Sequence, residues 1–293
     1  NGIDTINYAA ADASSGLTIN LATGLASGAA IGNDVLSGFE NVVGGAGADT
    51  ITGSDLTNSI QGGAGSDVIQ AGAGNDWVLF DSADASVDGG AGVDILAIQQ
   101  AGTINLVSNN HLAGFEEIDL TGNGLQTLVL DTTSVFGMSD TTDTLKVHGS
   151  VGDQLTLSGN WIAAGTQPVI YDNGAARQYN KYTYYDSVTQ TTATVLLSPD
   201  VTLTISYSGS AGNDTRTFDP SDLVVDGLGG IDTLRLDTVS AADVVLDLGD
   251  SAGRPAIANM EVIDISGKAS SSNYLVVTPA SVAQVSGGTT LTV

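Results

Sequence analysis

The apolar positions of residues 44–97 recur every nine residues. Written in nines, this stretch reads GGAGADTIT, GSDLTNSIQ, GGAGSDVIQ, AGAGNDWVL, FDSADASVD and GGAGVDILA. The last three places of each unit predict a minimal strand with one inward side chain, because side chains alternate between the two faces of a strand. The inward residue is the aliphatic one at the eighth place: Ile51, Ile60, Ile69, Val78, Val87 and Leu96.

Glycines at the first, second and fourth places allow tight turns, since glycine adopts positive φ without a Cβ clash. Two units then form one coil of 18 residues with two turns and two short strands, and the coils stack at about 4.8 Å, the spacing of paired strands. One sheet is expected to hold Ile51, Ile69 and Val87, and the other Ile60, Val78 and Leu96. The pattern therefore predicts an all-β chain with a parallel β-roll, or β-solenoid, whose aliphatic core is thin.

The sixth place is Asp or Asn in five of the six units, and Ala85 occupies it in the fifth. In coils of 18 residues, Asp49 and Asp67 fall on one edge, and Asn58, Asp76 and Asp94 fall on the other. Stacked carboxylates repel one another unless a divalent cation lies between successive turns. Ca²⁺ suits such turns because it takes six to eight oxygens from carboxylates and backbone carbonyls, whereas Mg²⁺ tends to keep its waters.

The pattern therefore predicts a few Ca²⁺ ions, with Asp49/Asp67 and Asp76/Asp94 as the best-defined pairs. Asn58 is a further candidate metal ligand, but its unit lacks two of its glycines as well as the carboxylate; pairing at Ala85 should fail. Ordinary β-turns without metal are the alternative, which the strict repetition disfavours. The remaining predicted metal ligands are Gly44, Ala46, Gly62, Ala64, Gly72, Gly74, Gly90 and Gly92, whose turns expose backbone carbonyls, and Asp232 of a later unit.

GGAGADTIT, GGAGSDVIQ and GGAGVDILA resemble the GGxGxDxUx repeat of the RTX (repeats-in-toxin, haemolysin-type) calcium-binding family. The resemblance covers under a fifth of the chain. It implies a parallel β-roll with Ca²⁺ in the turns, type I secretion, and folding outside the cell.

A longer repeat extends beyond the nonapeptides and indicates a tandem array of further short-strand coils. Its last two copies start 138 residues apart, from Asp94 to Asp232. Each copy later reaches a landmark containing Glu40, Glu116 or Glu261, which either binds calcium or, as we favour, accepts backbone N–H groups at a coil end. The predicted organisation is a first solenoid repeat at 1–43, the β-roll at 44–97, a second repeat at 98–159, an antiparallel β insert at 160–208, and a third repeat at 209–293.

Two short helical turns are expected within the array. Asp131 is a suitable N-cap for DTTSVFGMS (131–139). Thr278 and Pro279 suit the N-cap and first helical positions of TPASVAQVS (278–286).

Residues 160–208 read differently, with β-branched and aromatic residues alternating along the chain. Residues 178–186 and 193–198 are predicted to form a hairpin, and residues 201–207 a third strand. The aromatic residues either pack against the solenoid or bind a glycan or protein partner. The candidate ligand-binding residues are Trp161, Tyr182, Tyr184 and Arg177.

Composition narrows the function. The 33 acidic and seven basic residues give a net charge of −26, which argues against nucleic acid and anionic membranes as partners. The absence of cysteine excludes disulfides and thiolate metal sites. His111 and His148 lack recognisable catalytic partners in sequence, so we predict that the chain is not an enzyme. No signal peptide or transmembrane segment is visible, and the chain is expected to be part of a longer one.

These features favour a calcium-stabilised structural or adhesive module of a large, type I-secreted bacterial surface protein, such as an RTX adhesin, biofilm or surface-layer protein. Its expected partners are calcium ions, a cell-surface glycan or protein, or other copies of itself, without membrane insertion. One alternative is the calcium-folding export region of a secreted toxin or hydrolase. Another is a carbohydrate-binding module that uses the aromatic residues of 160–208.

Overall fold

The computed structural model divides the chain into two compact units. One comprises Asn1–Leu155 and Ala164–Thr202, and the other comprises Thr156–Ala163 and Leu203–Val293; each is described by itself. The described residues are 2–12, 16–108, 111–139, 142–170, 175–186, 188–208, 213, 215–217, 222–227, 231–236, 244–247, 256–265, 273–276 and 292–293.

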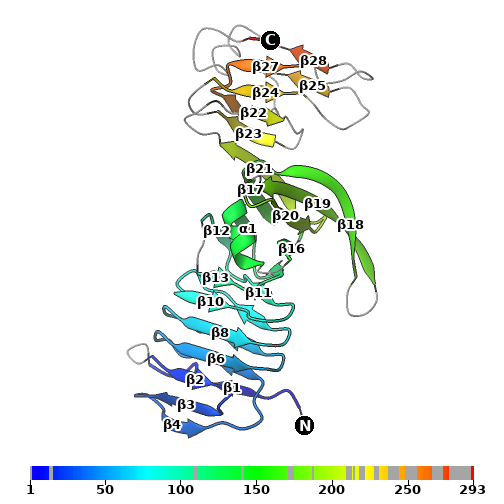
Figure 1. Cartoon of the computed structure of the whole chain (residues 1–293). Coiled ribbons are helices and arrows are strands. Elements are labelled where there is room, and N and C mark those ends of the chain that lie inside the picture. Colours follow the sequence, from blue (N-terminus) through cyan, green and yellow to red (C-terminus); the bar gives the residue numbers. More distant parts are fainter. Residues whose placement is uncertain are drawn as a thin grey trace. The chain divides into compact units, whose positions relative to one another are not determined.

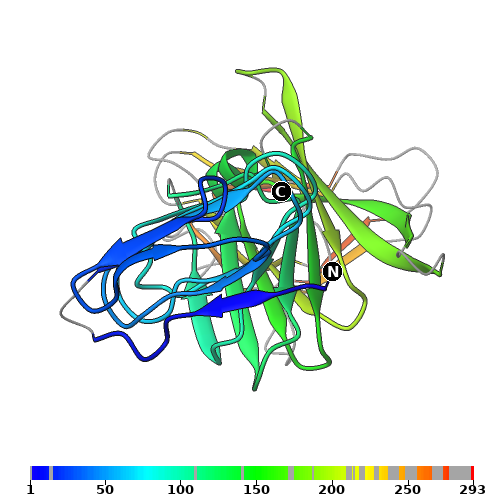
Figure 2. The same ribbon diagram turned by 90° about the horizontal axis from the view of Figure 1, so that it is seen from below.

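The first unit begins with the predicted parallel β-roll (Figure 1). In one sheet Val42 pairs with Ile60, Ile60 with Val78, and Val78 with Leu96, each step being 18 residues. Seen from below, the coils of the roll lie over one another (Figure 2). The parallel strands of this sheet are β1 (Thr5–Asn7), β5 (Asn41–Val43), β7 (Ser59–Gln61), β9 (Trp77–Leu79), β11 (Ile95–Ala97), β14 (Glu117–Leu120), β16 (Thr144–Gly149) and β20 (Thr191–Leu197).

The opposite sheet keeps the same period. Ile51 pairs with Ile69, and Ile69 with Val87, so the predicted register is confirmed. All six eighth-place residues are fully buried between the sheets. The strands are β2 (Thr18–Asn20), β6 (Thr50–Ser54), β8 (Val68–Gly72), β10 (Ser86–Asp88) and β13 (Leu112–Ala113), which are parallel.

An antiparallel meander that the sequence did not predict ends this sheet beside β2. The strands β3 (Leu25–Gly28) and β4 (Gly32–Val35) fold back from β2, with Ala26 opposite Ile19 and Asp34 opposite Ala26. The Tyr8 hydroxyl donates a hydrogen bond to the Asp34 carboxylate at 2.9 Å. The meander thus covers one end of the roll with a different strand direction.

Beyond the roll the coils become longer. The strand β12 (Gly102–Asn105) pairs in parallel with β15 (Gln126–Asp131), and β17 (Gln154–Ser158) follows. Between β15 and β16 lies α1 (Thr132–Met138), and Asp131 is its N-cap as predicted: the Ser134 N–H donates to Asp131 Oδ1 at 2.8 Å. The second predicted helical turn, at Thr278 and Pro279, lies outside the described residues.

The predicted hairpin is confirmed: β19 (Ala176–Asp186) and β20 pair antiparallel, with Tyr182 opposite Val195. The sequence missed β18 (Ile162–Ile170), which lies next to β19 in the sheet. The prediction that residues 201–207 are a third strand of this insert is wrong. That segment, β21 (Thr202–Ser208), pairs in parallel with β23 (Asp222–Asp226), as in a solenoid coil.

The second unit consists of parallel pairs whose core contains Leu234, Ile257 and Ile263. Residues 209–217, GSAGNDTRT, are a degenerate copy of the nonapeptide, and the inward side chain at its eighth place is Arg216, which is 2 % exposed. The Arg216 guanidinium donates to Asn160 Oδ1 at 3.1 Å and lies over the Tyr207 ring, so the buried charge is solvated by protein groups. The strands are β21, β22 (Thr215–Thr217), β23 (Asp222–Asp226), β24 (Thr233–Arg235), β25 (Val244–Asp247), β26 (Ala256–Ala258), β27 (Val262–Asp264) and β28 (Asn273–Val276).

Within the described part of the chain, no helix has the length and hydropathy needed to span a bilayer.

Candidate calcium sites in the turns of the roll

Carboxylates and backbone N–H groups form a ladder along each edge of the roll. On one edge, the Asp49 N–H donates to Asp67 Oδ1 at 2.8 Å, across one coil. Asp49 in turn accepts the N–H of Leu17 at 2.7 Å through Oδ1 and that of Gly45 at 2.6 Å through Oδ2. The predicted pair Asp49/Asp67 is therefore brought together in successive turns.

The other edge repeats the arrangement with the remaining sixth-place residues. The Asn58 N–H donates to Asp76 Oδ1, and the Asp76 N–H donates to Asp94 Oδ1, both at 2.7 Å. The Asp94 N–H donates to Glu116 Oε2 at 2.9 Å, which continues the ladder beyond the roll. Asp76 and Asp94 are therefore also neighbours in successive turns, as the 18-residue spacing predicts.

In two of these carboxylates, the second oxygen accepts no hydrogen bond. Asp67 Oδ2 and Asp76 Oδ2 are buried and lack a hydrogen-bond partner. Burial raises the pKa of both Asp67 and Asp76, against hydrogen bonds from backbone N–H groups that lower it. Buried carboxylate oxygens without donors are costly when ionised, and a bound cation would remove that cost. The donor set therefore fits Ca²⁺.

Glycine is required in these turns because successive coils approach closely. A Cβ on Gly63, whose φ is +108°, would lie 1.9 Å from the carbonyl oxygen of Gly45 in the coil before it. A Cβ on Gly62 would lie 2.3 Å from Asp67 Oδ2. The absence of side chains leaves backbone carbonyls and carboxylates close together, which is the oxygen-rich environment that Ca²⁺ prefers.

The predicted carbonyl ligands lie in these turns, and their coordination remains a prediction: Gly44, Ala46, Gly62, Ala64, Gly72, Gly74, Gly90 and Gly92. Some of these groups already take part in contacts between coils; the Gly72 carbonyl accepts the Ala91 N–H at 2.9 Å. Among the described residues, no three His, Asp or Glu side chains form a metal-binding group. Calcium in these turns would therefore depend on backbone oxygens as well as on carboxylate pairs.

Asn58 differs from the aspartates because its side-chain amide already links two coils. Asn58 Nδ2 donates to the Glu40 carbonyl oxygen, 18 residues earlier, and Oδ1 accepts the Ser54 N–H, both at 2.7 Å. The amide thus supplies a donor where a second carboxylate would need a cation. These bonds argue against Asn58 as a metal ligand.

The degenerate fifth unit retains a carboxylate that the sequence did not reveal. Ala85 occupies the expected place, but Asp84, one residue earlier, is 6 % exposed and lies close to Asp67. Its Oδ2 accepts the Asp81 N–H at 2.9 Å, whereas Oδ1 is buried without a hydrogen-bond partner. Burial, aided by the charges of Asp67 and Asp81, raises the pKa of Asp84 to about 7.

The preference for hydrogen bonding by the landmark glutamates is confirmed. Glu40 Oε2 accepts the Asp4 N–H, and Glu261 Oε2 accepts the Asp232 N–H, each at 2.9 Å. Asp153, which the sequence also missed, accepts the N–H of Gln126 at 2.9 Å. The signal for Asp153 is its VGD turn (151–153) immediately before a strand, which is easily taken for an ordinary turn.

Asp232 lies in the second unit in a similar environment. It is fully buried, and a Cβ on Gly227 would lie 2.5 Å from its Oδ2. Residues 228–230 of its turn lie outside the described residues, so Asp232 stays a predicted ligand on the evidence of its burial and close glycine contact.

The aromatic residues proposed for ligand binding separate into different roles. Trp161 is fully buried and donates through Nε1 to the Ser158 carbonyl, so its ring cannot receive a ligand and that prediction is wrong. Tyr182 and Tyr184 pair with the buried Val195 and Ala193 of β20. Trp161 therefore packs within the protein, and the pairing of the two tyrosines with buried residues favours packing for them as well.

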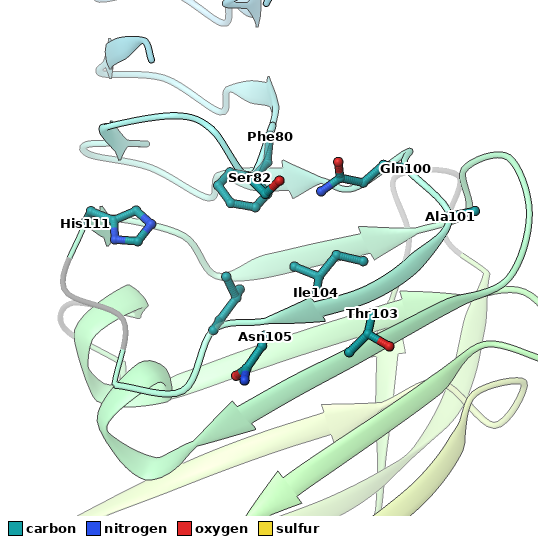
Figure 3. Close-up of a pocket in the computed structure, with 9 residues that line it drawn as sticks. Phe80, Ser82, Gln100, Ala101, Thr103, Ile104, Asn105 and His111 are labelled. Atoms are coloured by element: carbon teal, nitrogen blue, oxygen red, sulfur yellow. The ribbon is translucent and has the colours of Figure 1, made fainter. Parts of the chain in front are cut away.

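Two small hollows lie beside the degenerate unit. One, of about 250 Å³, is shown in Figure 3, with Phe80, Ser82 and His111 toward one end and Gln100 and Ala101 toward the other. The other, of about 170 Å³, is lined by Phe80, Asp81, Asp84 and the Gly62–Gly63 turn. His111 thus borders an open hollow at a turn.

Fold and turns together define a parallel β-roll with carboxylate edges suited to calcium. The family model of the RTX calcium-binding nonapeptide repeat, with four copies, matches residues 36–55 and 52–84. This segment therefore carries RTX repeats, which bind calcium in their turns and occur in secreted proteins. Comparisons with curated proteins and with solved structures found no match.

Proposed function

We propose that the chain is a structural and adhesive module of a large bacterial surface protein, exported unfolded by type I secretion and folded by extracellular Ca²⁺. The observation that carries the proposal is the pair of carboxylate ladders, in which Asp67 Oδ2 and Asp76 Oδ2 are buried without donors. RTX repeats make it a calcium-binding structural module of a secreted protein.

Charge supports a calcium-dependent switch. A net charge of −26 opposes compaction of the chain when divalent cations are scarce. Extracellular calcium modules have dissociation constants of about 10⁻⁴ to 10⁻³ M. At ten times that constant, each occupied site stabilises the folded state by about 1.4 kcal/mol, so several sites together give a steep response.

The coils beyond the roll support a structural role over a pure export signal. Residues 98–159 contain parallel short strands, and so does the described part of the second unit, although few nonapeptides occur in either. An export region would need only the nonapeptides. Further copies of the 138-residue repeat in the parent chain would support the surface-protein proposal, and an upstream hydrolase or toxin domain would support the export alternative.

The test is a calcium titration of the purified chain followed by far-UV circular dichroism, with Mg²⁺ as the control cation. We expect strand content to rise cooperatively with Ca²⁺ near 10⁻⁴ to 10⁻³ M and to stay low in chelator or Mg²⁺. A chain that is equally folded in chelator and in Ca²⁺ would refute the proposed switch.

A further inference from the structure

A groove of about 690 Å³ lies on the outer face of the sheet that contains β9, β11, β14 and β16. Its floor comes from the roll and the coils that follow it, and its wall comes from the antiparallel insert, which contributes Arg177 and Tyr179. One end of the groove reaches Asp76, a predicted calcium ligand, but calcium binding does not account for the rest of it. The groove belongs entirely to the first unit.

The floor contains an aromatic residue that the roll does not need. Trp77 occupies the seventh place of its unit, where the other five units have Thr, Ser, Val, Ser and Ile. Its neighbour Val78 is fully buried, so alternation along β9 directs Trp77 outward, and it is partly exposed. In register with Trp77 across the sheet lie Ile95 and then Glu117. Trp77 is therefore a partly exposed ring on the outer face of the sheet rather than a core residue.

A chain of hydrogen bonds fixes the polar groups beside this ring. The Tyr179 hydroxyl oxygen lies 2.5 Å from His148 Nδ1, and His148 Nε2 lies 2.9 Å from Glu117 Oε2. Lys146 also pairs with Glu117. Although burial raises the pKa of Glu117, the bonds from His148 and Lys146 outweigh it and lower that pKa to about 2. The ionised Glu117 thus holds the His148 ring in one orientation, which reduces the entropy lost when a ligand binds.

The charge of the chain limits the class of ligand. A net charge of −26 repels polyanions, and Asp119 adds a carboxylate within the groove itself. Arg177 is paired with Asp200 at 2.7 Å, so the groove does not present an uncompensated cation. A neutral ligand rich in hydroxyl groups suits this mixture of donors and acceptors.

The shape of the groove favours an elongated ligand. It crosses β9, β11, β14 and β16, and three steps at the strand spacing of about 4.8 Å give a span of about 14 Å. Saccharide rings offer an apolar face to an aromatic ring and hydroxyl groups to carboxylates, imidazole and guanidinium. The span fits an oligosaccharide of a few rings better than a single sugar.

We propose that this groove binds a neutral oligosaccharide, with Trp77 as the stacking platform and Asp119 as a hydrogen-bonding partner, while His148 and the buried Tyr179, which already bond within the protein, shape the wall. The inference deepens the adhesive part of the proposed function and rests on it for its biological setting. It moves the glycan site from the buried Trp161 to a different aromatic residue on the outer face of the sheet.

The test is binding of the calcium-saturated chain to an array of neutral, uronic-acid and amino-sugar oligosaccharides, followed by calorimetry on the neutral compounds that bind. Trp77→Ala should weaken binding at least tenfold, or by about 1.4 kcal/mol. Asp119→Asn, which keeps the size of the side chain, should also weaken it. Tyr185→Ala is the matched control, because Tyr185 is 60 % exposed on the insert but does not line the groove.

Circular dichroism in Ca²⁺ checks that each variant is folded. If the Trp77→Ala variant does not fold, the binding measured for Asp119→Asn tests the proposal. The proposal is overturned if no neutral oligosaccharide binds, if uronic-acid or amino-sugar compounds are preferred, or if a folded Trp77→Ala or Asp119→Asn variant binds like the parent. A chain that folds with calcium but binds no glycan refutes the groove alone. A chain that binds glycan and folds without calcium refutes the calcium switch alone.

Discussion

Replacing Asp67 by asparagine separates the two roles of the carboxylate ladder. Asp67 is fully buried, its Oδ1 accepts the Asp49 N–H, and its Oδ2 has no hydrogen-bond partner. Asn keeps the first bond and replaces the second oxygen by a donor next to the Asp84 carboxyl, which contacts Asp67. The same substitution therefore has opposite effects with and without calcium.

Without calcium, Asp67→Asn should stabilise the chain. It removes a buried charge and supplies a hydrogen bond to a charged group, worth about 1.5–3 kcal/mol. With calcium, the loss of one charged ligand should raise the calcium midpoint about tenfold. This corresponds to a loss of about 1.4 kcal/mol of binding free energy for the affected ion. Asp67→Ala, by contrast, leaves the buried Asp49 N–H unsatisfied and should destabilise the chain under both conditions.

The assay is urea unfolding followed by circular dichroism at a series of calcium concentrations, and in chelator with a stabilising osmolyte that favours the folded chain when calcium is absent. Asp55→Asn is the matched control, since Asp55 is an exposed acid of the same segment and its replacement removes the same charge. Equal destabilisation by Asp67→Asn in chelator and in calcium, or an unchanged calcium midpoint, would refute the reasoning.

Three further predictions use the same unfolding assay. Because the folded pKa of Asp84 is raised to about 7 from an ordinary value of 3.8, the folded state holds a proton that the unfolded state has lost; stability in chelator should therefore fall as pH rises from about 4 to about 7. Asp84→Asn should flatten that dependence, and equal slopes in the two proteins would contradict the assignment. Asn58→Asp replaces the donor to the Glu40 carbonyl by a second oxygen, so it should cost about 1–3 kcal/mol in chelator and recover in calcium; a loss that calcium does not reduce would count against a cation site there. Asp131→Ala removes the N-cap of α1 and should cost about 1 kcal/mol whether or not calcium is present, so a calcium-dependent loss would show that this cap is coupled to the roll.

The roll could be predicted closely because its determinants are local and repeated. A glycine-rich turn, an acidic sixth place and an aliphatic eighth place recur at one spacing, and that spacing alone sets the pairing of Ile51 with Ile69 and of Val78 with Leu96. The edges on which the aspartates lie follow from the same 18-residue coil. The 18-residue register of the strands was therefore sufficient to locate the candidate metal sites.

Features that break the period could not be predicted from it. Asp84 lies buried beside Asp67 from one residue before the expected place, and the FDSADASVD unit lacks the glycines of the repeat. Arg216 points inward at the place where the units of 44–97 have an aliphatic residue, and Asn160 and Tyr207 accommodate it. The alternating residues 201–207 resembled a hairpin strand, but tertiary pairing placed them in a parallel sheet.

The groove was missed for a related reason. Trp77 lies inside a nonapeptide and Arg177 inside the insert, 100 residues apart, and only the fold brings them to one hollow. Sequence reasoning assigned ligand binding to the segment where aromatic residues are dense. Exposure separates a platform such as Trp77 from a packed ring such as Trp161.

The central claim is that paired carboxylates in successive turns are held together by calcium. An anomalous-difference X-ray map of crystals grown in Ca²⁺ tests it most directly. The account predicts calcium peaks in the turns that carry Asp49 with Asp67 and Asp76 with Asp94. Ordered turns without any such peak would contradict it.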